Sequence, residues 1–167
     1  AIPDTSALVL ANVASATLSL SASETIGSLA GGGTTGGTVA LGANTLTTGG
    51  DDSSTSFAGV IGGTSGALTK QGSGSFTLSG ANTYTGGTTL TGGNLLIASA
   101  GALGGTGAIT FAGGTLQWAA TNTADNSARF STAAGQAYAF DTNSQSVTLA
   151  TNLTSAGGTL DKRGAGT

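Results

Sequence analysis

Short runs in which apolar and polar residues alternate recur along the whole chain. Phe76 and Leu78 are separated by one residue, as are Leu116 and Trp118, so each pair points to one face of an extended strand. Ile109/Phe111, Tyr138/Phe140 and Val147/Leu149 follow the same spacing. The pattern predicts many short strands and a chain that is all β. The predicted strands are Leu8–Leu10, Thr17–Leu20, Ile26–Leu29, Val39–Leu41, Thr45–Thr48, Ser56–Ile61, Ala67–Thr69, Ser75–Ser79, Thr88–Thr91, Asn94–Ala98, Ala108–Phe111, Thr115–Ala119, Ala128–Ser131, Ala137–Asp141, Ser146–Ala150 and Gly158–Asp161.

Glycine-rich corners separate these runs. Gly49-Gly50, Gly80-Ala81-Asn82 and Gly92-Gly93 are typical of them, and glycine and asparagine supply the positive φ that a sharp corner needs. Short strands could form a sandwich, an antiparallel barrel or a β-solenoid. The corners, the small or medium size of the inward residues and an internal repeat favour the solenoid. No long Leu-, Glu- or Lys-rich stretch predicts a helix, so an all-α or α/β domain is excluded.

The internal repeat joins two distant parts of the chain. Gly66–Ser75 recurs as Gly158–Thr167, with Lys70 and Lys162 in matching positions. At roughly 20–25 residues per coil, we expect one continuous β-helix over residues 1–167 with about seven or eight coils. We also expect Lys70 and Lys162 to lie at equivalent corners, and the natural protein to continue beyond Thr167.

Composition narrows the possible partners. Only 7% of the residues are charged, the net charge is −3, and the basic residues are Lys70, Arg129, Lys162 and Arg163. A surface that binds nucleic acid or anionic lipid needs clustered Lys and Arg, so neither partner is expected. No apolar run approaches the roughly 20 residues of a membrane span, and no stretch resembles a signal peptide. Without cysteine there is no disulfide framework.

The segment Gly66–Leu96 carries the most specific motif. It begins Gly-Ala-Leu-Thr-Lys-Gln-Gly-Ser-Gly-Ser-Phe-Thr-Leu-Ser-Gly-Ala-Asn-Thr-Tyr-Thr-Gly-Gly-Thr-Thr-Leu and closely resembles the autotransporter passenger-associated β-strand repeat. Gly158–Thr167 resembles the start of a second copy. Phe76 stands where that family usually has Leu, and Asp161 where it usually has Thr. Looser likeness in other segments, such as Ala137–Leu153, brings the coverage to about two thirds of the chain.

The resemblance implies a right-handed, single-stranded parallel β-helix in a large bacterial protein that is displayed at the cell surface or secreted. It supplies no catalytic, cofactor-binding or metal-binding residue, and we expect none. We therefore expect a non-catalytic stalk or scaffold segment, adhesin-like, rather than an enzyme. Its expected partners are adjacent β-helix repeats of the same or a neighbouring chain, and a host or matrix surface. An alternative is a subunit of an extracellular filament, built by end-to-end stacking of β-helices.

Few charged residues are candidates for chemistry. The chain has no His or Cys, which excludes the common metal sites and nucleophilic triads. Asp51-Asp52 predicts a solvated turn, with a calcium site as the alternative. Arg129 could join Asp125 and Asp141 in the groove of a polysaccharide-active β-helix enzyme, a remote alternative. A plain surface ion pair is the simpler interpretation.

Threonines and aromatics suggest contact surfaces. Thr-x-Thr tripeptides raise the remote alternative of an ice-binding protein, but their starts do not share one coil period.

We expect Phe57, Phe76, Phe111 and Phe140 to fill the interior. Tyr84 follows Asn82-Thr83 at a corner, and we expect it to be the best exposed candidate for glycan or protein contact. Trp118 fits interior packing and a cover over an open coil edge equally well. Asn and Thr at the corners are expected to extend hydrogen bonding along the axis.

Overall fold

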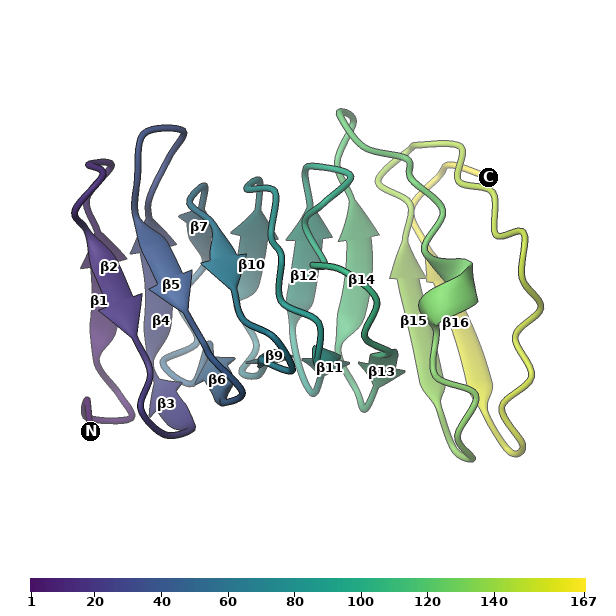
Figure 1. Cartoon of the computed structure of the whole chain (residues 1–167). Helices are drawn as coiled ribbons and strands as arrows, with labels where there is room; N and C mark the ends of the chain where they lie inside the picture. The colour runs from purple at the N-terminus through teal and green to yellow at the C-terminus, as the bar shows by residue number, and fades with distance from the viewer.

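The computed structural model describes residues 1–167, and its strands stack side by side along one long axis (Figure 1). All pairings between strands are parallel. The chain therefore winds as a parallel β-solenoid, which confirms the predicted fold. The largest sheet holds eight strands, so the chain makes about seven turns. With about 4.8 Å between neighbouring strands, the rod is on the order of 35 Å long.

Three sheets form the sides of the solenoid. Sheet A contains, in spatial order, β1 (Ala7–Leu10), β4 (Ser28–Gly31), β7 (Thr55–Phe57), β10 (Ser75–Leu78), β12 (Asn94–Ile97), β14 (Thr115–Trp118), β15 (Ala137–Asp141) and β16 (Thr159–Arg163). Sheet B contains β2 (Thr17–Ser19), β5 (Thr38–Ala40) and β8 (Ile61–Gly62). Sheet C contains β3 (Glu24–Ile26), β6 (Thr45–Thr48), β9 (Ala67–Lys70), β11 (Gly87–Leu90) and β13 (Ile109–Phe111).

The core is one narrow column inside the coils. In sheet A, Phe76, Leu95, Leu116 and Phe140 are register partners in successive strands, and all four side chains are buried. Leu78 is buried as well, so the inward assignment of Phe76 and Leu78 is confirmed. The buried apolar side chains form a single cluster that extends from Ile26 to Phe140. Each coil thus covers the apolar face of the next, as the repeat architecture requires.

Several predicted strands differ from the structure at corners. Ser56–Ile61 is not one strand, because the chain turns between β7 and β8. A Cβ at Gly59 would lie 1.8 Å from the carbonyl oxygen of Gly37 in the coil below, so only glycine permits this close approach. Ile26–Leu29 is likewise divided between β3 and β4 at Gly27.

Two predicted strands near the C-terminus are wrong because backbone amides that a ladder would use bond elsewhere. Ala128–Ser131 overlaps the short 3₁₀ helix η1 (Ser127–Arg129), where the amides of Arg129 and Phe130 donate to the nearby carbonyls of Asn126 and Ser127. Ser146–Ala150 forms no strand, because the Ala150 amide donates to Asp125 at 3.0 Å. Val147 and Leu149 still pack against the core.

The two copies of the internal motif lie in different sheets. Lys70 ends β9 in sheet C, whereas Lys162 lies in β16, which pairs with β15 in sheet A. The expectation that they occupy equivalent corners is therefore wrong. The physical reason is the pairing of the second copy. β16 pairs with β15 of sheet A along five residues, whereas β9 of the first copy pairs within sheet C.

Asparagine side chains connect successive coils through the backbone. Asn82 accepts a hydrogen bond from the Ile61 amide at 2.8 Å and donates to the Ala102 carbonyl at 2.6 Å. Asn122 donates to the Ser99 carbonyl at 2.8 Å. The predicted bonding along the axis is confirmed, although it runs from side chain to backbone and not through a stack of asparagines.

Candidate functional site

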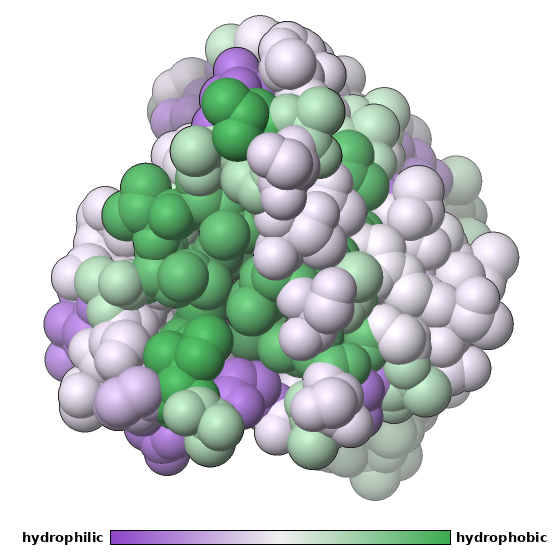
Figure 2. Space-filling model, turned by 60° about the vertical axis from the view of Figure 1, so that its left-hand side comes forward, coloured by the Kyte–Doolittle hydropathy of each residue, from purple (hydrophilic) through white to green (hydrophobic).

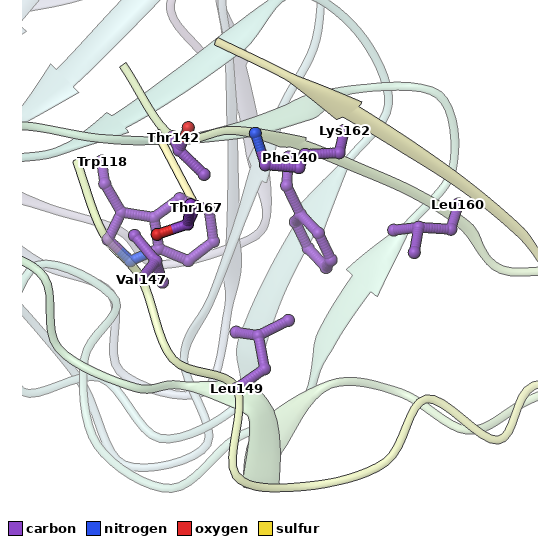
Figure 3. A pocket seen from close by; sticks show the side chains of 8 residues that line it. All are labelled: Trp118, Phe140, Thr142, Val147, Leu149, Leu160, Lys162 and Thr167. Carbon is purple, nitrogen blue, oxygen red and sulfur yellow. The ribbon is translucent and has the colours of Figure 1, made fainter. Parts of the chain in front are cut away.

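A small cavity opens at the C-terminal end of the solenoid. Its volume is about 140 Å³. Figure 3 shows the rings of Trp118 and Phe140 and the side chain of Leu149 around it. The lining residues come from β14, β15, the following loop, β16 and the C-terminal residue, and they are Trp118, Phe140, Thr142, Val147, Leu149, Leu160, Lys162 and Thr167. Lys162 is the one titratable side chain among them, so the cavity can hold an apolar group but has no acid–base pair.

Trp118 belongs to the interior. Its side chain is buried, and its indole N–H donates to the Ala124 carbonyl at 3.3 Å. Its ring meets that of Phe140 edge-on at 5.7 Å. Of the two interpretations of Trp118, interior packing is correct, and the indole also forms one wall of the end cavity.

The four phenylalanines predicted inside are all buried. Phe57, Phe76, Phe111 and Phe140 are each at most 4% exposed. Phe111 and Phe140 meet edge-on at 5.4 Å, and Phe130 packs against both. These aromatic contacts gather in the last coils, where the sheets are least complete.

Tyr84 is not an exposed contact residue. Its side chain is fully buried, and its hydroxyl lies 2.6 Å from the Thr88 hydroxyl. Burial raises the pKa of Tyr84 to about 12. The prediction fails because sheet B ends at β8, so in the next coil the Tyr84 ring fills space on the side where no strand forms. A glycan or protein contact through Tyr84 is therefore ruled out in this fold.

Asp51 and Asp52 form a turn, and their carboxylates reach in opposite directions along the axis. Asp51 accepts from the Ser53 amide at 3.0 Å, and a hydrogen bond from Ser28 in the coil below lowers its pKa. Asp52 accepts from the Ser73 amide in the coil above at 2.6 Å, which lowers its pKa too. Each carboxylate thus bonds to the backbone or side chain of a neighbouring coil. No group of three or more His, Cys, Asp or Glu side chains gathers at a possible metal site.

Arg129 does not pair with Asp125 or Asp141. Its guanidinium donates to the carbonyls of Leu103, Gly104 and Gly107 at 2.8, 3.3 and 3.0 Å. Asp125 instead bonds to backbone amides, and Asp141 accepts from the Gln117 side chain at 2.8 Å. Arg129, Asp125 and Asp141 therefore form neither the expected cluster nor a surface ion pair. The single salt bridge of the structure joins Arg163 and Asp161.

Sequence reasoning missed the burial of Lys70. Its side chain is 1% exposed and points inward at the end of β9. Its ammonium nitrogen lies 2.6, 3.3 and 3.3 Å from the carbonyl oxygens of Gln71, Gly72 and Gly92. The alternating pattern does predict this burial, because Lys70 lies two residues after the inward Leu68 and therefore points to the same face of the strand.

One threonine from each coil forms a column on the outside of sheet C. Thr25, Thr47, Thr69, Thr89 and Thr110 are register partners in successive strands. The Thr-x-Thr tripeptides did not predict this column, because Thr25, Thr69 and Thr110 do not belong to such tripeptides. The neighbouring outward position holds Thr45, Ala67 and Gly87 in successive strands, so the paired columns of an ice-binding face are not formed.

The N-terminal end is also apolar. Ile2, Leu8, Leu10, Leu18 and Leu20 pack partly buried against the core. Figure 2 shows hydrophobic residues gathered in the middle of this end, with more polar ones around them. A shallow hollow lies beside them, lined partly by Ile2, Leu18 and Glu24.

Helical structure is limited to η1, and no helix is long and apolar enough to cross a bilayer.

Residues 68–97 match the family model of the passenger-associated-transport-repeat. This match coincides with the motif at Gly66–Leu96 and covers β10, β11 and β12. No curated protein and no solved structure matches the chain.

Proposed function

Because this chain is an autotransporter passenger β-repeat protein, we propose that it is a non-catalytic spacer, a stalk that holds other parts of a surface-displayed or secreted bacterial protein away from the cell. The family is one of extracellular passengers, which supports a role outside the cell. The observation that carries the proposal is the unbroken sheet A, whose eight parallel strands run from one end of the chain to the other.

The distribution of polar groups supports a passive role. Buried Lys70 and half-buried Arg129 bond to backbone carbonyls, and the carboxylates of Asp51, Asp52 and Asp125 bond to backbone amides of neighbouring coils or of their own turn. These groups stabilise the coils and do not converge on a shared cavity. Stability is therefore spread over the interfaces between coils, as a rigid spacer requires.

Changing the number of coils tests the spacer role. Thr47 and Thr69 are register partners, so residues 48–69 form one whole coil. Inserting three further copies of residues 48–69 after Thr69 should lengthen the rod by about 15 Å while preserving the β-rich circular dichroism spectrum. The maximum dimension from small-angle X-ray scattering measures the change. An insertion of residues 48–58 alone breaks the register and should misfold, which provides the control.

Binding assays test the passive character. The purified chain, presented to arrays of glycans and matrix proteins, should show no saturable binding. Saturable binding that is lost on substitution of outward residues, such as Thr69→Lys in the threonine column, would contradict a passive spacer and support an adhesin.

A second candidate, a filament subunit, is favoured by the two open ends. β1 and β16 each have a partner on one side only, and unpaired strand edges invite further strands. Both ends are apolar. Asp4 and Glu24 lie near the first coil, and β16 carries Lys162 in addition to the paired Arg163 and Asp161. The occupant in this candidate is a second copy of the chain, whose β1 continues sheet A beyond β16.

Electron microscopy and sedimentation distinguish the two candidates. Stacked copies would form fibres or a concentration-dependent series of oligomers, and Leu160→Glu in the exposed end strand should abolish them without unfolding the chain. A passive stalk should sediment as a monomer both as wild type and as Leu160→Glu.

A further inference from the structure

The ammonium group of Lys70 lies in a corner made of backbone carbonyls. It donates to Gln71 and Gly72, which form the corner between β9 and β10, and to Gly92, which lies in the corner one coil further along. No carboxylate lies within ion-pair distance of Lys70, since Arg163–Asp161 is the one salt bridge present. The group therefore joins two coils through hydrogen bonds to the main chain.

Glycines in the neighbouring coils leave the space that this ammonium occupies. A Cβ at Gly49, one coil below, would lie 3.2 Å from the Lys70 nitrogen, and a Cβ at Gly93, one coil above, would lie 2.9 Å from it. Both glycines have left-handed backbone conformations, with φ of +106° and +58°. The corner is thus enclosed from both neighbouring coils and fits a group of ammonium size.

The carbonyls at this corner need a donor. A buried carbonyl without a partner costs free energy comparable to a lost hydrogen bond, and chain reversal at glycine corners turns carbonyls away from the ladder. Arg129 meets the same need elsewhere, because its guanidinium donates to three carbonyls of the preceding coil. Two of the four basic residues therefore bond to the main chain between coils, Lys70 fully buried and Arg129 half-buried.

We propose that the corner formed by Gln71, Gly72 and Gly92 is a binding site for a primary ammonium group, filled by the Lys70 side chain, and that this group fastens the coil of β9 to the coil of β11. Burial lowers the pKa of Lys70, opposed by the nearby charge of Asp52. The protonated group has one N–H for each of the three carbonyls, and the neutral amine would have two.

Lys162 provides a natural comparison within the same chain. It has the same local bonds, to the carbonyls of Arg163 and Gly164 at 3.5 and 3.0 Å. The third carbonyl, which the next coil supplies to Lys70, has no counterpart, and Lys162 is exposed. The two lysines thus share the bonds to their own corner and differ in their burial and in the link between coils that the proposal assigns to Lys70.

The first test compares Lys70→Met with Lys162→Met in the whole chain. Methionine preserves the length of the side chain and removes the donor. Lys70→Met should lower the melting temperature by about 4–10 °C, and Lys162→Met should leave it within about 1 °C of wild type. Equal shifts in the two variants, or no shift in Lys70→Met, would overturn the proposal.

The second test asks whether the emptied corner binds a free amine. Lys70→Ala should be destabilised, and methylammonium chloride should raise its melting temperature more than that of wild type. Tetramethylammonium chloride at equal concentration carries the same charge but cannot donate, and it should not discriminate between the two proteins. The same response of wild type and variant to both salts would contradict an ammonium site. If Lys70→Ala does not fold alone, its recovery of the β-rich spectrum in methylammonium, but not in tetramethylammonium, is the readout, and failure in both contradicts the site.

Discussion

Two copies of one motif, Gly66–Ser75 and Gly158–Thr167, have opposite surroundings. In the first copy Leu68 is 0% exposed, because coils lie on both sides of it, whereas in the second copy Leu160 is 60% exposed. Lys70 and Lys162 differ in the same way. The same motif sequence therefore does not by itself bury its leucine and lysine side chains. Their burial requires a neighbouring coil on each side.

The largest difference is expected from a charge at the two matched leucines. Leu68→Asp places an unpaired carboxylate in the closed core and should cost about 4 kcal/mol or more of unfolding free energy. Leu160→Asp should change it by about 0.5 kcal/mol or less. Urea denaturation followed by circular dichroism measures both. Similar costs at the two sites would show that the second copy is as enclosed as the first.

Hydroxyl groups test the comparison on a smaller scale. Tyr84→Phe removes the fully buried bond to Thr88 and should cost about 1 kcal/mol. Tyr138→Phe, nearer the open end, removes a partly buried bond to the Ser131 carbonyl at 2.7 Å and should cost less. Thermal melts of the two variants measure the difference. A larger cost for Tyr138→Phe would contradict the view that the last coils are the less enclosed ones.

Acid should lower the stability of the fully stacked middle coils by protonating Asp51 and Asp52. Their pKa values are lowered in the folded chain, so the folded carboxylates bind protons less readily than the unfolded ones. Their contribution to stability is present above the usual pKa of 3.8 and is lost as the pH falls through the lowered values. Melting temperatures between pH 6 and pH 2 should fall less steeply for the double variant Asp51→Asn/Asp52→Asn than for wild type. Parallel curves would contradict this assignment.

The smallest effect is expected at Thr48, the register partner of Lys70 in the coil below. Its hydroxyl is buried and has no hydrogen-bond partner. Thr48→Val keeps the shape and removes the unpaired oxygen, so it should leave the unfolding free energy unchanged or raise it by about 1 kcal/mol. A clear loss of stability in chemical denaturation would indicate that the hydroxyl is used.

The sequence was sufficient for the fold wherever alternation and glycine corners agreed. The inward positions of Phe76 and Leu78 follow from alternation, and the parallel stacking is what the family resemblance of Gly66–Leu96 implies. Tyr84 could not be placed, because its burial depends on the absence of a strand beside it, which no local pattern encodes. The bonds of Arg129 were equally hidden, because their acceptors are carbonyls 22 to 26 residues away.

Engineered disulfides test the stacked parallel register most directly, since the chain has no cysteine of its own. Thr47 and Thr69 are register partners in adjacent strands of sheet C, whereas Thr47 and Thr89 are two strands apart. Adjacent strands bring the Cα atoms to about 5 Å, within the range of a disulfide, and two strands separate them by about 10 Å, beyond it. The double variant Thr47→Cys/Thr69→Cys should form an intramolecular disulfide on mild oxidation, and Thr47→Cys/Thr89→Cys should not. A disulfide in the second pair but not in the first would contradict the parallel solenoid.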